Sequence, residues 1–366
     1  MDNCLQRFSK FKKYYFNELI EIKSPADFFN KIRCSLKTVQ HATIFTMYTG
    51  DCNLTKKILK LISEREKTNK KTRIVLDKNR GQTKNLVNFI KENNLNCFKF
   101  VNLSTFINIL RIREILAVFH SKLYIFDDEI ILTGANLDGS YFTNRLDRYF
   151  IIKNKVLIND LYRKQYSKNT NKDTNSDYNV LFKYGRKNEK YVISEILQQN
   201  FDSIYISSAY FNLPTDYLNL FKSYKNIHFF VNAPDSNIFT NFSIFGFLIT
   251  SIYTYSSYYA TKYLPKALLY EFNLKGYTMH KKGLWAFKDN FCVSIIGSSN
   301  FNRRSTERDE ELNFCVITQD SKTVRIFKEE ILFLMKHSKL KTVNEFKFGK
   351  FKFIAAILFF IFNKFL

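Results

Sequence analysis

The stretches HSKLYIFDDEIILTGAN (residues 120–136) and HKKGLWAFKDNFCVSIIGSSN (residues 280–300) decide how this sequence folds. Each begins with His-x-Lys, runs through apolar residues on either side of a polar turn, and ends in a short segment with Gly and Asn. This pattern predicts a β-hairpin, in which residues two positions apart share one face of the strand. The His and the Lys of each copy therefore point the same way. We expect each pair to contact an anionic group, because lysine binds phosphate as a point charge.

The polar residues of the two copies follow similar spacings. The first copy fits the pattern HxKx4Dx6GxN through His120, Lys122, Asp127, Gly134 and Asn136. The second copy retains His280, Lys282, Gly297 and Asn300. We expect the two His/Lys pairs and Asp127 to be catalytic. Asn136 and Asn300 are expected to add neutral donors to a bound phosphate.

The two halves of the chain resemble each other beyond the hairpins. Apolar runs predict strands at 41–50 and 71–81 in the first half, and at 203–211 and 226–236 in the second. The interval from Thr43 to Ser203 equals that from His120 to His280, as expected of a duplicated unit. Helical segments fit between the strands, which predicts an α/β fold with a mixed, helix-flanked sheet in each of two lobes.

A polar stretch divides the two halves. Residues 166–179, YSKNTNKDTNSDYN, have almost no aliphatic content, which is typical of a linker. We therefore expect an N-terminal lobe at 1–165, a C-terminal lobe at 180–345 and a basic, apolar tail at 346–366. Because each lobe supplies one hairpin of the same kind, a pseudo-twofold axis is expected to relate the lobes.

Two histidines can divide the work of phosphoryl transfer. One attacks phosphorus and forms a phosphohistidine, while the other protonates the leaving group and then deprotonates the incoming hydroxyl. One lobe supplies one such histidine, so the active site is expected between the lobes. A carboxylate can hold the second nitrogen of each imidazole, and Asp147 and Glu311 are the candidates. Arginines near these acids are alternative partners for them: Arg145, Arg148, Arg303, Arg304 and Arg308.

The paired motifs resemble the HKD signature of the phospholipase D superfamily. Over about residues 40–318, several segments resemble the eukaryotic phosphatidylglycerophosphate synthases of that superfamily: LDKNRG (76–81), TGANLDGSYFTNRLDRYF (133–150), YFNL (210–213), NAPDSN (232–237) and HKKGLWAF (280–287). The resemblance implies two phospholipase D-like lobes and transfer of the phosphatidyl group from CDP-diacylglycerol to glycerol 3-phosphate, with release of CMP. It also implies that no metal or other cofactor is bound, and a mitochondrial place in phosphatidylglycerol and cardiolipin synthesis.

One position departs from the HKD pattern. Phe287 stands where the general motif has aspartate, and Asp289 follows two positions later. The complete first motif therefore favours His120 as the nucleophile and His280 as the acid and base.

The charge and the apolar segments indicate an anionic membrane surface as a partner. A formal net charge of +24 favours anionic partners, although lysines that only solvate the surface would give the same total. Residues 353–362 are uncharged, too short to span a bilayer, and suited either to an interfacial anchor or to a helix packed on the protein's own core. Residues 236–261 are also uncharged, and we expect a membrane-facing or acyl-chain-binding excursion there, with buried core as the alternative. A single span at this place would put His120 and His280 on opposite sides of the membrane.

Several other functions fit the same motifs. A cardiolipin synthase, a phosphatidylserine synthase, a phospholipase or a nuclease would use the same phosphohistidine chemistry. A catalytically silent binding protein is disfavoured by the intact His/Lys pairs. We expect no nucleic-acid partner, because the apolar tail serves no purpose on DNA. Membrane association at the mitochondrion is expected, with the endoplasmic reticulum as the alternative.

Overall fold

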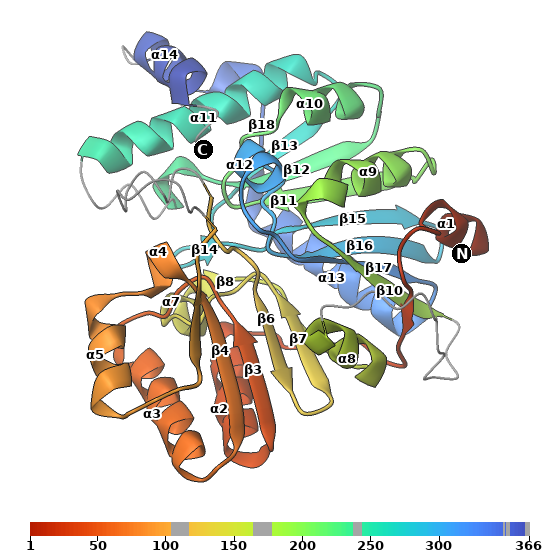
Figure 1. Cartoon of the computed structure of the whole chain (residues 1–366). Helices are drawn as coiled ribbons and strands as arrows, with labels where there is room; N and C mark the ends of the chain where they lie inside the picture. Colours follow the sequence, from red (N-terminus) through yellow and green to blue (C-terminus); the bar gives the residue numbers. More distant parts are fainter. Residues whose placement is uncertain (104–116, 164–177, 237–243, 347, 349–351, 363–366) are drawn as a thin grey trace.

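Two mixed β-sheets form the frame of the molecule (Figure 1). The computed structural model describes residues 1–103, 117–163, 178–236, 244–346, 348 and 352–362. The first sheet has the strand order β2 (Ile20–Glu21), β9 (Tyr149–Lys153), β7 (Glu129–Thr133), β6 (Leu123–Phe126), β3 (His41–Phe45), β4 (Lys71–Asp77) and β5 (Phe98–Val101). The second has the order β1 (Tyr14–Tyr15), β10 (Asn179–Tyr184), β17 (Asn313–Thr318), β16 (Phe291–Gly297), β15 (Gly283–Lys288), β11 (Ser203–Ser208), β12 (Ile227–Asn232), β13 (Leu268–Phe272) and β18 (Ser338–Lys341).

The first sheet is repeated within the second. The order β2-β9-β7-β6-β3-β4-β5 corresponds to β10-β17-β16-β15-β11-β12-β13. In both sheets the first five strands of this order run antiparallel to their neighbours, and the last three are mutually parallel. The predicted α/β fold with a duplicated unit is therefore confirmed. The repeat places the two His-bearing hairpins at equivalent positions of two similar lobes.

Helices cover the outer face of each sheet and form one hydrophobic core with it. A third hydrophobic core lies between the two lobes. The longer helices are α2 (Pro25–Thr38), α3 (Asn53–Lys67), α5 (Lys84–Glu92), α8 (Lys155–Arg163), α9 (Arg186–Leu197), α10 (Thr215–Lys222), α11 (Ile244–Tyr263), α13 (Ser321–Lys336) and α14 (Lys352–Phe362). The short ones are α1 (Asp2–Arg7), α4 (Lys78–Gly81), α7 (Ser140–Thr143), α12 (Arg303–Glu307) and the 3-10 turns Pro234–Ser236 and Val343–Glu345. Apolar residues of α2 and α3 pack on the first sheet, and those of α9 and α10 pack on the second. The inner faces of both sheets share one core with α8 and α13, which fixes the lobes against each other.

Short strand pairs also cross between the lobes. Strand β8 (Arg145–Leu146) of the first lobe pairs in parallel with β14 (Thr278–Met279) of the second. On the opposite side of the pseudo-twofold axis, Phe119 forms a parallel bridge with Glu310. The residues that follow Met279 and Phe119 in the chain are the two motif histidines, so backbone hydrogen bonding between lobes sets their positions.

The N-terminal residues belong to the second lobe, contrary to the expected boundary at residue 1. Strand β1 pairs with β10 at the edge of the second sheet. Cys4 and Phe8 are buried in the same core as Phe182. A strand of two residues shows no detectable periodicity, so the sequence pattern could not predict that the N-terminal residues join the second lobe. Of the predicted linker, residues 166–177 lie outside the described residues, and Asn179 already begins β10.

The uncharged segment and the apolar tail form two packed helices. Helix α14 lies on α11, which in turn contacts the second lobe (Figure 1). Ala260 of α11 and Leu264 just beyond it are buried in the core of that lobe, so part of this segment is core, as the alternative prediction had it. Among the described residues, no helix is both long and apolar enough to cross a membrane.

Candidate active site

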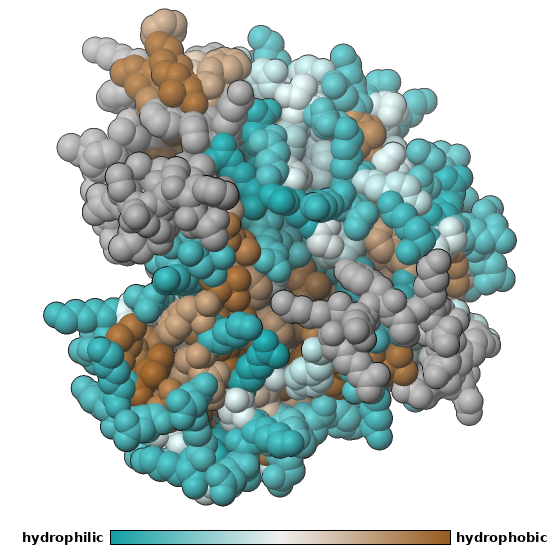
Figure 2. Space-filling model, viewed as in Figure 1, coloured by the Kyte–Doolittle hydropathy of each residue, from teal (hydrophilic) through white to brown (hydrophobic). Residues whose placement is uncertain are grey.

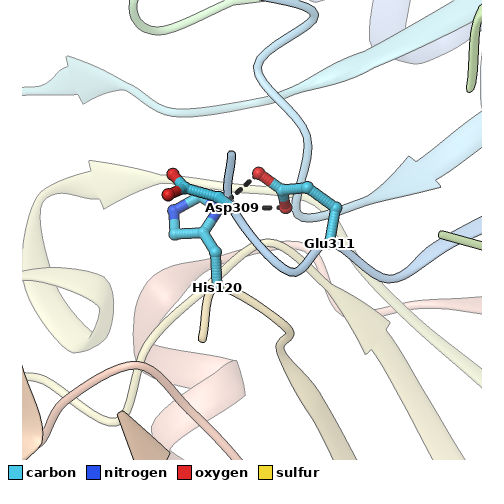
Figure 3. Close-up of side chains that lie close together, drawn as sticks. All are labelled: His120, Asp309 and Glu311. Atoms are coloured by element: carbon cyan, nitrogen blue, oxygen red, sulfur yellow. Dashed lines mark hydrogen bonds and ion pairs between the residues drawn. The ribbon is translucent and has the colours of Figure 1, made fainter. Parts of the chain in front are cut away.

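His120 is held by the second lobe. Its backbone amide donates to the carbonyl of Glu310 at 3.0 Å. Its side-chain Nδ1 donates to the two carboxylate oxygens of the next residue, Glu311, at 2.8 and 3.0 Å (Figure 3). The hydroxyl of Ser298 donates to the same carboxylate. A buried carboxylate in this position fixes the tautomer in which Nε2 keeps its lone pair.

His280 is held in the same way by the first lobe. Its amide donates to the carbonyl of Leu146 at 2.6 Å, and its Nδ1 donates to Asp147 at 2.5 Å. Asp147 also accepts hydrogen bonds from the amides of Gly134 and Arg148, at 3.3 and 2.7 Å. The two predicted acids are thus both brought to imidazoles, and each acid serves the histidine of the opposite lobe.

The predicted lysines and asparagines surround the histidines. Both lysines are buried, and Lys122 Nζ has no hydrogen-bond partner among the described residues. Lys282 Nζ donates to the carbonyl of Ser298 at 2.8 Å. Asn136 is fixed through its Oδ1, which accepts from the Met47 amide at 3.0 Å, whereas Asn300 Oδ1 has no partner among the described residues. Buried polar groups without partners are rare, so these atoms indicate a site that is completed by a ligand.

Burial controls the protonation of the site. Burial, together with nearby Lys122 and Lys282, holds the pKa of His120 well below its usual value. Burial and the neighbouring cations do the same to the pKa of His280. Burial raises the pKa of Asp147 to about 6 and lowers the pKa of Lys282 to about 8. Both imidazoles are therefore neutral near pH 7, with a lone pair available on Nε2.

A cavity of about 340 Å³ lies over both histidines. Its wall includes both asparagines and three arginines: Arg80, Arg145 and Arg304. Four tyrosines also line it, Tyr48, Tyr141, Tyr210 and Tyr253, the last of which comes from α11. A second cavity, of about 780 Å³, opens on the other side of Glu311 and is lined by neither histidine. The smaller of these two cavities is therefore the one from which a single ligand can contact both imidazoles.

Comparisons with known proteins agree with this geometry. The family model described as "Cardiolipin synthase, PLD-like domain" matches residues 32–169. The mitochondrial CDP-diacylglycerol–glycerol-3-phosphate 3-phosphatidyltransferase of Gallus gallus is 23% identical, over 82% of this chain and 74% of its own length. The probable enzyme of the same name from Dictyostelium discoideum is 24% identical, over 96% of this chain and 78% of its own. The chain is thus similar to a phospholipase D-like domain over residues 32–169 and to phosphatidyltransferases over most of its length.

Solved structures show the same fold. The crystal structure of phosphatidylserine synthase from Haemophilus influenzae superposes with a TM-score of 0.80 at 16% identity and covers 99% of this chain and 96% of that one. Polyphosphate kinase from Porphyromonas gingivalis superposes with a TM-score of 0.56 at 8% identity, over 89% of this chain and 48% of that one. The fold shared with phosphatidylserine synthase thus accounts for nearly the whole chain.

The superfamily aspartate does not lie in the active site, contrary to our expectation for Asp127. This residue begins the turn between β6 and β7, at φ 51°. Its carboxylate accepts from the amides of Gln40 and His41 at 3.1 and 2.8 Å, which fixes the start of β3. Asp127 therefore stabilises the far end of the hairpin and does not contact the histidines.

The second lobe has its aspartate too, displaced by a longer hairpin. Strand β6 ends six residues after His120, whereas β15 ends eight residues after His280. The turn of the second hairpin therefore begins at Asp289, which has the same φ of 51° as Asp127. Phe287 simply continues the strand into the shared core. The second motif therefore does not lack its aspartate, as counting residues had suggested. This difference between the motifs gives no reason to prefer His120 as the nucleophile.

A different feature makes the histidines unequal. The hydroxyl of Tyr141 lies 3.2 Å from Nε2 of His280 and donates to it, because Nδ1 carries the proton shared with Asp147. Tyr141 follows Asn136 by five residues, and the equivalent position after Asn300 is Ser305. The described residues offer no hydrogen-bond partner to Nε2 of His120. Of the two imidazoles, His120 is thus the one whose lone pair faces an open cavity.

Two of the arginines that were alternative partners of the acids, Arg148 and Arg304, pair with other carboxylates. Arg148 binds Glu330 through Nε and Nη2, at 3.0 and 2.7 Å, and both side chains are buried. Arg304 Nε donates to Asp309 at 2.9 Å. These pairings leave Asp147 and Glu311 to the histidines.

His120, Asp309 and Glu311 form a compact cluster whose ligand-type atoms lie within 4.8 Å of one another (Figure 3). Each acid already has a partner, however. Glu311 accepts from His120, and Asp309 accepts from Arg304 and from the amide of Val118 at 3.1 Å. The cluster is explained by hydrogen bonding alone, and a metal would have to displace a guanidinium and an imidazole proton.

Sequence reasoning missed the tyrosines of the cavity and the cavity roles of Arg145 and Asp309. No sequence spacing predicts a tyrosine beside an imidazole. Tyr141 and Arg145 do, however, lie in the segment 133–150 that resembles the phosphatidylglycerophosphate synthases. The histidines outside the motifs lie away from the cavity, and are His41, His228 and His337.

Proposed function

We propose that this protein transfers the phosphatidyl group of CDP-diacylglycerol to glycerol 3-phosphate, releasing CMP and forming phosphatidylglycerophosphate. The observation that carries the proposal is the crossed arrangement of two His–carboxylate pairs around one cavity. It requires both lobes and places two imidazoles on one substrate phosphate. The relatives named above are CDP-diacylglycerol–glycerol-3-phosphate 3-phosphatidyltransferases, and they supply the identity of donor and acceptor.

In the first half-reaction, Nε2 of His120 attacks the phosphorus that bears diacylglycerol. The P–O bond to CMP breaks, and CMP leaves as a phosphate anion with the bonding electron pair, so the neutral His280 keeps its Nε2 lone pair for the next step. Glu311 stabilises the positive charge that develops on His120 as the P–N bond forms. Burial lowers the pKa values of Lys122 and Lys282, and the negative phosphoryl oxygens favour the ammonium form of both side chains. These ammonium groups then stabilise the charge on the phosphoryl oxygens, which is the main requirement of phosphoryl transfer.

In the second half-reaction, the primary hydroxyl of glycerol 3-phosphate displaces Tyr141 from Nε2 of His280. His280 takes the hydroxyl proton, and Asp147 stabilises the resulting imidazolium, which afterwards releases the proton to solvent because burial holds the pKa of His280 low. The oxygen attacks phosphorus, the P–N bond breaks, and His120 recovers its lone pair. No step routes charge through a metal ion.

We also propose that the enzyme acts on a mitochondrial membrane surface. The curated animal relatives carry the word mitochondrial in their names. Both the donor and the product are lipids, and α14 presents exposed apolar side chains beside α11, which contributes Tyr253 to the cavity. Figure 2 shows these side chains as an apolar patch at the top of the molecule.

The test is a transfer assay with the purified protein. CDP-diacylglycerol in mixed micelles would receive radiolabelled glycerol 3-phosphate, and parallel tubes would receive serine, phosphatidylglycerol or buffer alone. We expect label in lipid and stoichiometric CMP only with glycerol 3-phosphate, and neither product with His120→Ala or His280→Ala. Preferred transfer to serine or phosphatidylglycerol, or free phosphatidic acid as the main product, would replace the proposed acceptor.

A further inference from the structure

Arg145 occupies an unusual position in the wall of the active-site cavity. It lies on β8, two residues before Asp147, and only 8% of it is exposed. Its guanidinium stacks over the ring of Tyr141, with 4.7 Å between Cζ and the ring centroid. One Nη2 hydrogen is donated to the hydroxyl of Tyr210 at 2.9 Å. Two aromatic side chains thus fix the guanidinium in one orientation.

This guanidinium lacks an anion. Among the described residues, no carboxylate lies within ion-pair distance of Arg145, and its buried Nε has no hydrogen-bond partner. Arg304, in the same wall, is by contrast paired with Asp309. A buried charge without a partner is costly, and such a group persists where a ligand supplies the missing charge.

The pseudo-twofold relation between the lobes sharpens this observation. Asp147 and Glu311 are equivalent, so the position two residues earlier is Arg145 in the first lobe and Asp309 in the second. The side of the cavity next to His280 therefore carries a cation where the side next to His120 carries an acid. The charges on the two sides of this otherwise symmetric site therefore differ. The unpaired positive charge of Arg145 lies on the side of His280.

The phosphatidyl phosphate does not need this residue. It meets both histidines, and the buried Lys122 and Lys282 already supply two ammonium groups for it. Arg145 is one aromatic ring further out: Tyr141 touches Nε2 of His280 with its hydroxyl and the guanidinium with its face. An acceptor hydroxyl that replaces the Tyr141 hydroxyl enters the cavity whose wall also contains the Arg145 guanidinium.

We propose that Arg145 is the recognition site for the phosphate of the acceptor, and so selects a phosphorylated alcohol over a neutral one. This inference rests on the proposed function and specifies the residue that decides the acceptor class. Arginine suits the role because its planar donors bind a phosphate dianion in two places at once. The phosphate of the departing CMP is joined directly to the leaving oxygen, so it lies closer to His280 than the guanidinium does.

The two half-reactions allow a direct test. Exchange of radiolabelled CMP into CDP-diacylglycerol, without acceptor, reports formation and reversal of the phosphohistidine. Transfer to glycerol 3-phosphate and to glycerol reports the second half-reaction with and without the acceptor phosphate. The variants are Arg145→Gln, which removes the charge, and Arg145→Lys, which keeps the charge but loses the planar pair of donors. Arg33→Gln removes the same charge from an exposed site on α2 and serves as the control.

We expect Arg145→Gln to raise KM for glycerol 3-phosphate by about 10- to 100-fold, the range for a lost charge-assisted hydrogen bond, while CMP exchange stays within about twofold. Its preference for glycerol 3-phosphate over glycerol should fall by the same factor. Arg145→Lys should lie between wild type and Arg145→Gln, and Arg33→Gln should match wild type.

Two results would overturn the inference alone. One is an unchanged preference for glycerol 3-phosphate over glycerol in Arg145→Gln. The other is a loss of CMP exchange in Arg145→Lys as large as its loss of transfer, which would assign the guanidinium to the nucleotide. A wild-type protein that shows neither CMP exchange nor transfer would instead overturn the proposed function, and this inference with it.

Discussion

Glu311 of the second lobe binds Nδ1 of His120 in the first lobe, at 2.8 Å. The reciprocal contact joins Asp147 of the first lobe to His280 of the second. Neither lobe contains a complete His–carboxylate pair of its own. The exchange arises because β8 and the segment around Glu310 each cross to the other lobe. Catalytic competence is therefore tied to the docking of the lobes.

The crossed pairs predict that the two acids act on different half-reactions. Glu311→Gln should slow formation of the phosphohistidine, because it removes the charge that stabilises His120. Asp147→Asn should slow its breakdown by glycerol 3-phosphate, because it weakens His280 as a base. Each loss should be about 100- to 10,000-fold, as for a triad carboxylate. Rapid quenching with CDP-diacylglycerol labelled in the phosphatidyl group would measure protein-bound label over time.

Asp147→Asn is thus expected to accumulate labelled protein when the acceptor is present, and Glu311→Gln is not. The control is Asp216→Asn, an exposed acid on α10. If instead Glu311→Gln accumulated the intermediate, each acid would act with the histidine of its own lobe, against the geometry found.

The sequence alone predicted much of the site and misplaced a part of it for identifiable reasons. The His/Lys pairs and the asparagines were found because a strand repeats every two residues and the hairpin occurs twice. The crossing could not be found, because each acid follows its own histidine by a similar interval along the chain. Only the course of β8 through space shows which histidine an acid reaches.

The predicted alignment of the two repeats was also wrong by two residues in this strand. Thr43 pairs with Ile125, five residues after His120, while Tyr205 pairs with Trp285, five residues after His280. Thr43 therefore corresponds to Tyr205 and not to Ser203. The even slip preserves the face to which each side chain points, so the predicted fold was unaffected.

The displaced hairpin turn gives a second prediction. Phe287→Asp would restore the HKD spacing by count, but it would bury a carboxylate in the core that the lobes share. We expect a loss of about 3 kcal/mol or more in the free energy of unfolding, and no gain in kcat. Asp127→Asn, which tolerates the positive φ, should cost about 1 kcal/mol and keep kcat within about twofold.

Urea denaturation and the transfer assay would be run on both variants. An Asp127→Asn enzyme with normal stability but a kcat reduced more than tenfold would return this residue to the catalytic machinery.

The shifted pKa values predict a bell-shaped pH dependence of kcat/KM. Because burial raises the pKa of Asp147 to about 6, its negative charge is lost as the pH falls through about 6. Because burial lowers the pKa of Lys282 to about 8, its positive charge is lost as the pH rises through about 8. The rate should decline on both sides of that window. Lys282→Arg should move the alkaline limb upward, since arginine stays protonated.

The measurement is kcat/KM for CDP-diacylglycerol from pH 5 to 9.5 at constant ionic strength. An alkaline limb that stays in place in Lys282→Arg would show that another group sets it.

The buried pair between Arg148 and Glu330 predicts where the lobes are most sensitive to mutation. Glu330 also accepts from Trp285 Nε1 at 2.9 Å, and Arg148 donates to the carbonyl of Ile295 at 2.7 Å. Glu330→Gln leaves a buried guanidinium without its counter-charge and should cost about 3–5 kcal/mol. Asp216→Asn, which breaks an exposed ion pair with Lys190, should cost less than about 1 kcal/mol. Equal melting temperatures for the two variants would contradict this ranking.

The exposed face of α14 predicts how the enzyme meets its lipid substrates. Ala355 and Phe359 are buried, whereas the large apolar side chains on the opposite face are exposed: Phe353, Ile354, Ile357, Phe360 and Ile361. Inserting such side chains into a bilayer surface is favourable by about 1.5–3 kcal/mol each. Replacing Phe353 and Ile361 by Asp should therefore weaken binding to anionic vesicles by about 100-fold or more. Leu332→Asp, on the exposed face of α13, is the matched control.

Two substrates separate membrane docking from catalysis. The Phe353→Asp, Ile361→Asp variant should lose activity on CDP-diacylglycerol in vesicles and keep it on a short-chain, water-soluble analogue, because Tyr253 and the cavity are untouched. Vesicle sedimentation would measure the binding directly. If the variant and Leu332→Asp sedimented alike, α14 would not be the docking element. If activity fell equally on both substrates, the change on α14 would have reached the cavity through α11, and its face would be structural.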